Sequence, residues 1–220
     1  MRSFRYILSL LLLFSAGFSF LYAEKDSSFA FIHPGMDQSK EDLDYVRSMV
    51  SKKQEPWKSA FDNLSKDISL DFIPQPFTFI SVGPYGANSM GGKEFSESAR
   101  KSYGFALMWY ITRDKRYAEK TIEILNSWSY RLWGFDANNA KLNVGLFGSL
   151  FLNAAEIIRY SYSDWKKEDI DQFERMVLTV FYPTIENFFT EANGNWDASI
   201  IKTMMCIAIF TDNKMMFDRA

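Results

Sequence analysis

Residues that commonly form disulfides, bind metals or activate nucleophiles are scarce in this sequence. Its 220 residues include one cysteine, Cys206, and one histidine, His33. A single cysteine cannot form an intramolecular disulfide, and its apolar surroundings predict a buried side chain. No His and Cys residues cluster at metal-ligand spacing, and no G-x-S-x-G motif marks a nucleophilic serine. We therefore expect neither a metal site nor an obligatory cofactor.

Charge of one sign is not concentrated anywhere in the chain. There are 25 basic and 27 acidic residues, giving a formal net charge of −2, and no block of lysines and arginines. This composition argues against nucleic acid as a partner. Residues 83–88 are glycine-rich, but no Lys-Ser or Lys-Thr pair follows them, so a nucleotide-binding loop is not indicated. A polyanion would have to bind at a local patch.

The first 23 residues have the organisation of a secretory signal peptide. Arg2 and Arg5 precede an uncharged, mostly apolar run over residues 6–20, and Ala23 lies just before a charged segment. The run is short for a membrane span, so no stable span is expected after cleavage. Cleavage removes two basic residues and no acidic one, which changes the net charge from −2 to −4. We expect a periplasmic or secreted protein with one domain over residues 24–220.

Hydrophobic periodicity in the mature part is helical almost throughout. No stretch has the alternating pattern of a strand, so the chain is predicted to be all-α. The loop over residues 72–88 is rich in proline and glycine, and loops of that length are often functional. Helices are expected at residues 39–50, 56–66, 95–112, 115–133, 142–160, 165–181 (before Pro183), 197–210 and 213–220.

Strongly hydrophobic helices alternate with more amphipathic ones along the chain. Residues 142–160 are apolar nearly all round, whereas residues 115–133 carry one apolar stripe. An inner ring and an outer ring of helices would require such alternation, so the pattern favours an (α/α) toroid. The sequence stops at Ala220 without a helix stop signal. We therefore expect an incomplete toroid, truncated at its C-terminal end.

The stretch Asn193-Gly194-Asn195-Trp196-Asp197 opens an apolar helix and is the strongest candidate for a binding site. Asparagine amides can hydrogen-bond a carboxylate without carrying charge, and tryptophan offers a flat face to a sugar ring. The free N–H groups and dipole of a helix N-terminus also favour an anion. Alternatively, Asn195 or Asp197 caps the helix and Trp196 packs in the core.

Further candidates lie in the loops. Tyr85 and Asn88 could offer hydroxyl and amide groups to a sugar from a lid or groove wall, or belong to a structural turn. Lys141, in the polar break before residues 142–160, could contact an acidic polysaccharide or be solvated. His33, beside Pro34 and Gly35, is expected to stabilise a turn rather than serve in catalysis.

Several short segments together resemble one enzyme family. In their order and spacing they are similar to the alginate lyase superfamily of helical-toroid polysaccharide lyases, including relatives that cleave glucuronan, over nearly the whole mature chain. The segments are HPGM at 33–36, ALMWYIT at 106–112, YA at 117–118, ILNSW at 124–128, AAEI at 154–157 and NGNW at 193–196.

The resemblance implies cleavage of a uronic-acid polysaccharide by β-elimination. In this superfamily an asparagine neutralises the uronate carboxylate, so Asn193 and Asn195 are the residues implied here, with Trp196 shaping the subsite. Relatives commonly carry a histidine beside the asparagine, where this chain has Gly194 and Asn195. Tyrosine, arginine and histidine proton carriers generally come from the second half of the toroid. The isolated chain is therefore expected to be inactive or nearly so.

Two other functions remain open from the sequence. A toroidal glycoside hydrolase acting on uronate oligosaccharides would need a pair of carboxylates, of which Asp197 could be one. A non-catalytic polysaccharide-binding protein could keep the same fold. Neither the uronic acid preferred nor the mode of attack follows from the sequence.

Overall fold

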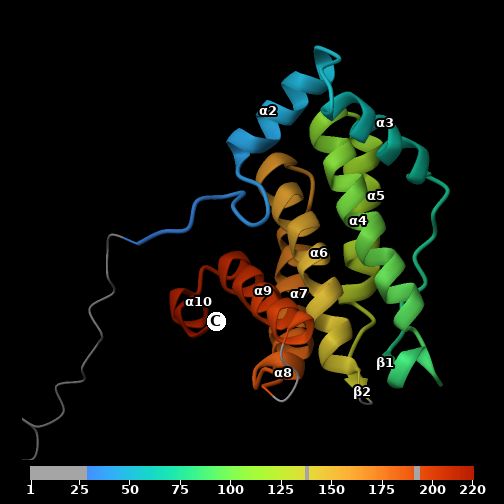
Figure 1. Ribbon diagram of the computed structural model, residues 1–220, viewed down its shortest axis with the longest axis vertical. Helices are drawn as coiled ribbons and strands as arrows, with labels where there is room; N and C mark the ends of the chain where they lie inside the picture. Colours follow the sequence, from blue (N-terminus) through green and yellow to red (C-terminus); the bar gives the residue numbers. More distant parts are fainter. Residues whose placement is uncertain (1–28, 137–138, 191–193) are drawn as a thin grey trace, which may run out of the picture. The chain divides into compact units, whose positions relative to one another are not determined.

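The structure, a computed structural model, consists mainly of helices, which confirms the predicted all-α class (Figure 1). It describes residues 29–136, 139–190 and 194–220, so the predicted signal peptide at residues 1–23 lies outside the described residues. The helices are α2 (Lys40–Ser51), α3 (Trp57–Asp67), α4 (Gly92–Thr112), α5 (Lys115–Ser129), α6 (Ala140–Ser161), α7 (Lys167–Met176), α8 (Tyr182–Ile185), α9 (Asn195–Phe210) and α10 (Lys214–Arg219).

Local sequence signals set several helix boundaries. Ser39 accepts a hydrogen bond from the backbone N–H of Asp42, and the Asp42 side chain reaches back to the Ser39 N–H, which completes a capping box at the start of α2. Between α4 and α5 the chain reverses over two residues. Arg113 adopts the left-handed conformation (φ 61°), and the Asp114 carboxylate caps α5 by accepting from the N–H of Arg116.

Most predicted helix boundaries lie within three residues of the observed ones, and two helix ends differ by more. The helix expected to reach residue 133 ends at Ser129, because the chain turns there toward a short strand. The helix expected over residues 165–181 continues from α7 through a π-helical segment, η2 (Val177–Phe181), into α8. Pro183 lies in the first turn of α8, where its missing N–H is tolerated.

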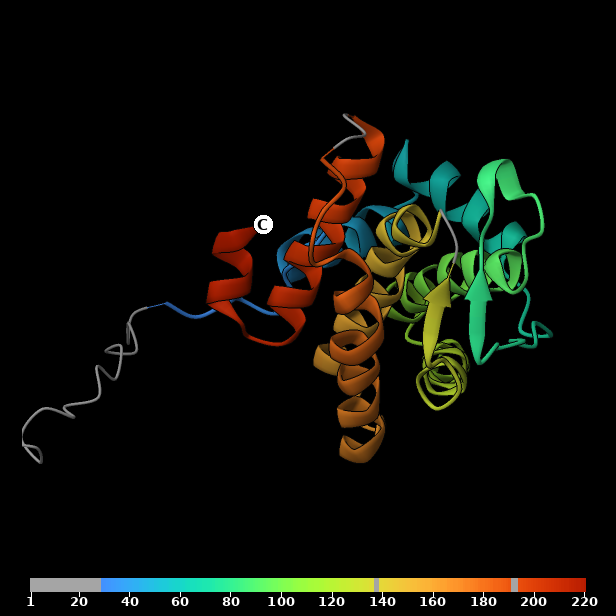
Figure 2. The same cartoon turned by 90° about the horizontal axis from the view of Figure 1, so that it is seen from below.

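A small sheet was not predicted. Strands β1 (Phe79–Ser81) and β2 (Gly134–Asp136) pair in parallel, with Ile80 opposite Phe135, and Figure 2 shows them side by side. Three-residue strands are too short for an alternating pattern to be visible in the sequence. The pairing is long-range and ties the loop before α4 to the segment before α6.

Helices α4, α6 and α9 pack side by side and run in the same direction. Near its start α4 approaches α6 at Asn143, and near its end Trp109 donates to Ser161. Likewise, Ser149 of α6 contacts Thr203 of α9, and Arg159 reaches the carbonyl of Phe210 further along. The N-termini of all three helices therefore lie at one end of this helix layer, the lower end in Figure 1.

The reverse-running helices pack behind this layer. Helix α5 packs on α4 and α6, and α7 packs on α5. A layer of parallel helices with returning helices packed against it is consistent with an (α/α) toroid, but the ring itself, complete or incomplete, remains a prediction.

An aromatic cluster joins the two layers. The ring of Phe95 meets those of Trp128, Phe135 and Phe181 edge-on, with centroids 5.2 to 5.7 Å apart. Helix α6 runs through the middle of the core. Within the described residues it is the one helix long and apolar enough to cross a membrane by composition, but 72% of its most apolar window is buried inside the protein. Its hydrophobicity is therefore explained by core packing.

Candidate functional site

Three segments precede α4, α6 and α9 at the end where these helices begin, and Asn139 and Lys141 link described residues of these segments through hydrogen bonds to Gly83 and Phe188. These are the loop before α4, the segment before α6 and the segment between α8 and α9. Neither Gly91, Asn139 nor Gly194, the residues preceding the three helices, provides a side-chain cap. The first N–H groups of these helices therefore have no capping side chain within the described residues, and their dipoles point toward this end.

Lys141 links α6 to the segment before α9. Its Nζ donates to the carbonyl oxygen of Phe188 at 2.7 Å and lies 5.5 Å from the centroid of the Phe189 ring. The side chain is half-buried and, among the described residues, forms no ion pair. Lys141 is therefore not the freely solvated side chain that was the alternative interpretation of the sequence. A cation held without an acidic partner can still attract an anionic ligand.

Trp196 and Asp197 contact the same segment. The Trp196 ring stacks on Phe189 with centroids 4.8 Å apart, and Asp197 Oδ1 accepts from the N–H of Phe189 at 3.3 Å. Trp196 is half-buried, so it is not a pure core residue. Asp197 fixes the approach to α9 and does not cap its N-terminus.

Asn195 is the first residue of α9, and its side chain is exposed. It is not the N-cap, since Gly194 occupies that position with φ 101°. Within the described part of the chain no hydrogen bond holds this amide, so it can meet a ligand. Asn193, the other predicted carboxylate partner, lies outside the described residues.

Tyr85 and Asn88 are both exposed and both have left-handed backbone conformations, with φ of 54° and 52°. Their loop is attached to the start of α6: Asn139 donates from its backbone N–H to Val82 and from its side chain to the carbonyl of Gly83, each at 3.0 Å. The loop therefore lies beside the N-terminus of α6. Hydrogen bonds and ring contacts therefore connect the segments that carry Tyr85, Asn88, Lys141, Asn195 and Trp196 at the N-terminal end of the helix layer.

Two further polar side chains near this end were missed by sequence reasoning. Asn143, in the first turns of α6, is 8% exposed, and its Oδ1 is buried without a hydrogen-bond partner among the described residues. Arg100, two turns into α4, is exposed, and its guanidinium lies 4.8 Å from the centroid of Phe147. It forms no ion pair in the described part of the chain. The sequence offers no signal that distinguishes Asn143 from other polar residues of α6 such as Asn153 and Glu156.

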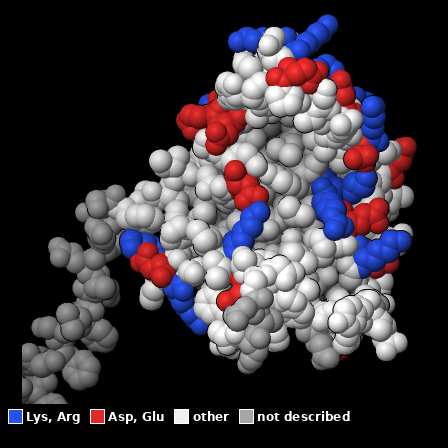
Figure 3. Space-filling model, in the orientation of Figure 1, with Lys and Arg blue, Asp and Glu red and all other residues white. Residues whose placement is uncertain are grey.

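The surface charge is mixed. Figure 3 shows one face on which basic and acidic residues are interspersed among large uncharged areas. Binding of an anion thus depends on local groups, as expected from the sequence. Among the described residues, no three His, Cys, Asp or Glu side chains are grouped to hold a metal ion.

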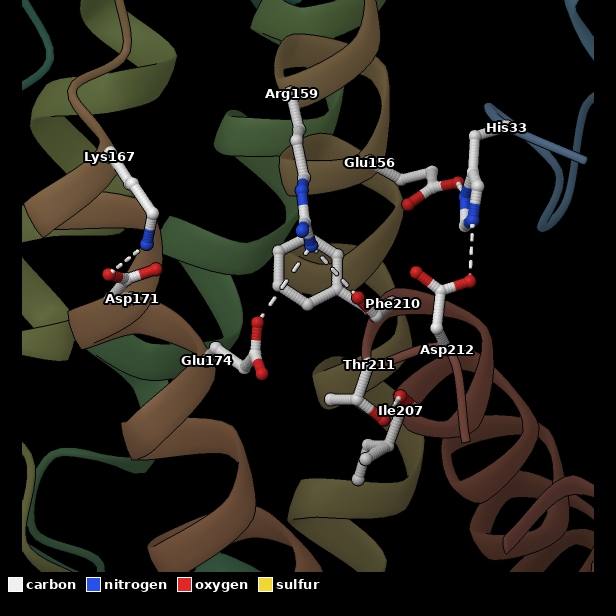
Figure 4. A network of polar contacts seen from close by, with 10 residues as sticks. All are labelled: His33, Glu156, Arg159, Lys167, Asp171, Glu174, Ile207, Phe210, Thr211 and Asp212. Carbon is white, nitrogen blue, oxygen red and sulfur yellow. Dashed lines mark hydrogen bonds and ion pairs between the residues drawn. The ribbon is translucent and has the colours of Figure 1, made fainter. Parts of the chain in front are cut away.

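His33 lies at the opposite end of α6. Its Nδ1 is 2.6 Å from Glu156 Oε1, and its Nε2 is 3.1 Å from Asp212 Oδ1 (Figure 4). Its ring stacks on Tyr160 at 4.3 Å. At a rise of about 1.5 Å per residue, Glu156 is roughly 24 Å along α6 from Ala140. His33 therefore does more than stabilise a local turn: it fastens the N-terminal segment to α6 and to the end of α9.

The chemistry available at the N-terminal end of the three helices is recognition of an anion attached to a ring. An exposed amide, a cation without an acidic partner and three helix N-termini favour a carboxylate, while the exposed Tyr85 and half-buried Trp196 offer aromatic faces.

A comparison with protein families gives one match. The family model described as Alginate lyase matches residues 38–220. No curated protein and no solved structure matches the chain significantly. The match contains all the candidate site residues and leaves out His33.

Proposed function

The chain belongs to the alginate lyase family, and on this basis we propose that it binds a uronic-acid polysaccharide of the alginate or glucuronan type and cleaves it by β-elimination. The family supports a polysaccharide lyase. The polyuronate substrate and the roles of individual residues are our proposal, as is export to the periplasm or the medium.

β-Elimination sets specific demands on the site. Loss of the C5 proton of a uronate shifts negative charge onto the carboxylate, so this group needs hydrogen-bond donors or cations that act more strongly as charge develops. A general base takes the C5 proton, and a general acid protonates the departing O4. We assign residues to carboxylate recognition and none to proton transfer.

The carboxylate would be met by the amides at the start of α9 and by Lys141. Asn195 presents its amide at the helix N-terminus, and Asn193 precedes it by two residues. Trp196 would lie under the sugar ring, while Tyr85 and Asn88 would contact hydroxyl groups from the loop side.

The observation that carries the proposal is the meeting of Lys141 and Trp196 on a single aromatic ring. Both contact Phe189, although they come from different helices and lie 55 positions apart in the chain. A cation and an indole on adjacent elements, beside an exposed amide, form the combination that an acidic sugar requires.

The proposal is tested by following the ultraviolet absorbance of the unsaturated uronate product. The purified chain and a longer protein that contains it are incubated in parallel with alginate, glucuronan and neutral polysaccharides. For the longer protein, which would also carry proton-transferring residues, we expect absorbance to rise with a polyuronate and not with a neutral polymer. The chain alone should give little or no rise. Reducing ends released without this absorbance would instead identify a hydrolase, and binding without either product a non-catalytic protein.

Variants then separate the residue roles. Loss of one donor to a developing negative charge lowers turnover by roughly 100-fold to 1,000-fold, which we expect for Asn195→Ala or Asn193→Ala. Lys141→Ala should also lower turnover. Lys167→Ala is the matched control, because Lys167 is 80% exposed on α7 and paired with Asp171. Full activity in both asparagine variants would reject these amides as the carboxylate partners.

A further inference from the structure

A trough on the outside of the protein leads to the candidate site. It consists of two adjoining hollows of about 410 and 510 Å³, which share Trp133, Thr179 and Val180 as lining residues. One hollow extends to Tyr130 and Arg175, and the other to Lys141 and Phe189. Since Lys141 and Phe189 belong to the candidate site, we call this continuous surface the outer trough.

The outer trough presents two large aromatic side chains to solvent. Trp133 is 73% exposed and Tyr130 is 56% exposed. The Tyr130 hydroxyl donates to Asp169 at 2.8 Å, which holds its ring, and the backbone N–H of Trp133 donates to the carbonyl of Thr78 at 2.8 Å, which holds its main chain. The two exposed side chains line the same hollow and offer aromatic faces on which sugar rings can stack.

The polar groups of the outer trough favour an acidic ligand. Arg175 donates to Gln172 at 2.9 Å but forms no ion pair within the described residues, so part of its guanidinium remains available. Lys141 supplies a second cation at the other end. The one carboxylate among the lining residues, Asp136, accepts from the Ser81 hydroxyl at 3.1 Å. The lining therefore has a net positive charge.

We propose that the outer trough is a second binding surface for acidic polysaccharide, separate from the residues around the reacting linkage. Trp133 and Tyr130 stack on sugar rings, and Arg175 pairs with a uronate carboxylate. Because the trough ends at Lys141, it holds a distant part of the chain whose other part enters the candidate site. This inference rests on the proposed function for its ligand class.

Electrophoresis of the folded protein in gels containing alginate or glucuronan measures the binding without requiring catalysis. Stacking and cation contacts at exposed sites imply that Trp133→Ala and Arg175→Ala each weaken polymer binding roughly twofold to fivefold, and the double variant more. Tyr45→Ala and Arg116→Ala, at exposed positions outside the trough, are the matched controls and should migrate like the parent protein. Turnover of short oligosaccharides by the Trp133 and Arg175 variants should stay unchanged, while KM for the long polymer rises.

Two results would overturn the inference. Unchanged migration of the double variant would show that the outer trough does not bind the polymer. Lowered turnover of short oligosaccharides would place Trp133 or Arg175 within the reacting site. Failure of the proposed function is distinguishable, because a longer protein that contains this chain would then form no unsaturated product, while migration in the gel still measures polymer binding at the outer trough. Loss of retardation at high salt would be expected for the arginine contact.

Discussion

Replacement of His33 by alanine tests the attachment of the N-terminal segment. Glu156 is 1% exposed and has two partners for its Oε1: His33 at 2.6 Å and the N–H of Gly35 at 3.2 Å. His33→Ala removes the stronger contact and leaves a buried carboxylate. Removing one partner of a buried pair destabilises a protein by about 3–5 kcal/mol. Asp212 is 61% exposed, so its contact with His33 accounts for about 1 kcal/mol or less.

The stability lost in the His33→Ala variant should depend on pH. Burial raises the pKa of Glu156 above its ordinary value of 4.5, while its hydrogen bond and ionic attraction to His33 lower it in part. Without His33 the pKa of Glu156 rises further. A carboxyl whose pKa is raised by folding stabilises the native state below its unfolded pKa, and this stability is lost as pH rises through the folded pKa. The destabilisation by His33→Ala should therefore be small below pH 4.5 and grow above it.

Urea unfolding followed by tryptophan fluorescence measures the effect at about pH 4 and about pH 7. Asp212→Ala is the control for the exposed partner. Glu156→Gln removes the charge, so His33→Ala in that background should cost much less and show little pH dependence. A loss below about 1 kcal/mol at both pH values in the parent background would refute the reasoning.

Three other substitutions test the packing and the caps. Phe95→Ala should destabilise the protein by about 3–5 kcal/mol in urea unfolding, because its fully buried ring is the centre of the aromatic cluster; a loss near zero would contradict that position. Gly145→Ala should cost about 1–3 kcal/mol, because its Cβ would lie 2.7 Å from Ser199 Oγ and 3.1 Å from the backbone of Ile200. An unchanged thermal midpoint would show that α6 and α9 are less closely packed. Ser39→Ala should cost about 1 kcal/mol through loss of the capping box, whereas Ser51→Ala, at the exposed C-terminal end of α2, should be neutral.

Much of the fold could be predicted from the sequence because the signals are local. The spacing of apolar residues depends only on helical periodicity, so most helices were placed within a few residues of their observed bounds. The capping box at Ser39 is a signal of the same local kind, since it lies within four consecutive residues. The strands β1 and β2 were missed because their pairing joins residues about 55 positions apart.

The candidate site was predicted as residue types and not as an arrangement. Asparagine, tryptophan and lysine were selected for their chemistry, and the structure connects their elements through Phe189 and Asn139. Asn143 was missed, since a buried amide oxygen that lacks a hydrogen-bond partner among the described residues is recognised only when its neighbours are known. The role of His33 could not be predicted either, because its partners lie 123 and 179 positions away.

The sequence by itself determined the all-α class and the family, because these depend on composition, periodicity and ordered motifs, whereas the chemical kind of site stays a prediction. The tertiary structure decided which side chains meet. The small residues Gly145 and Gly148 bring α6 and α9 into close contact, and this packing sets the direction and rotation of both helices. A rotation of one helix by a third of a turn about its axis would turn Lys141 or Asn195 away from the segments that it faces at the shared end. Such rotations are fixed by packing between distant segments, which no local signal in the chain encodes.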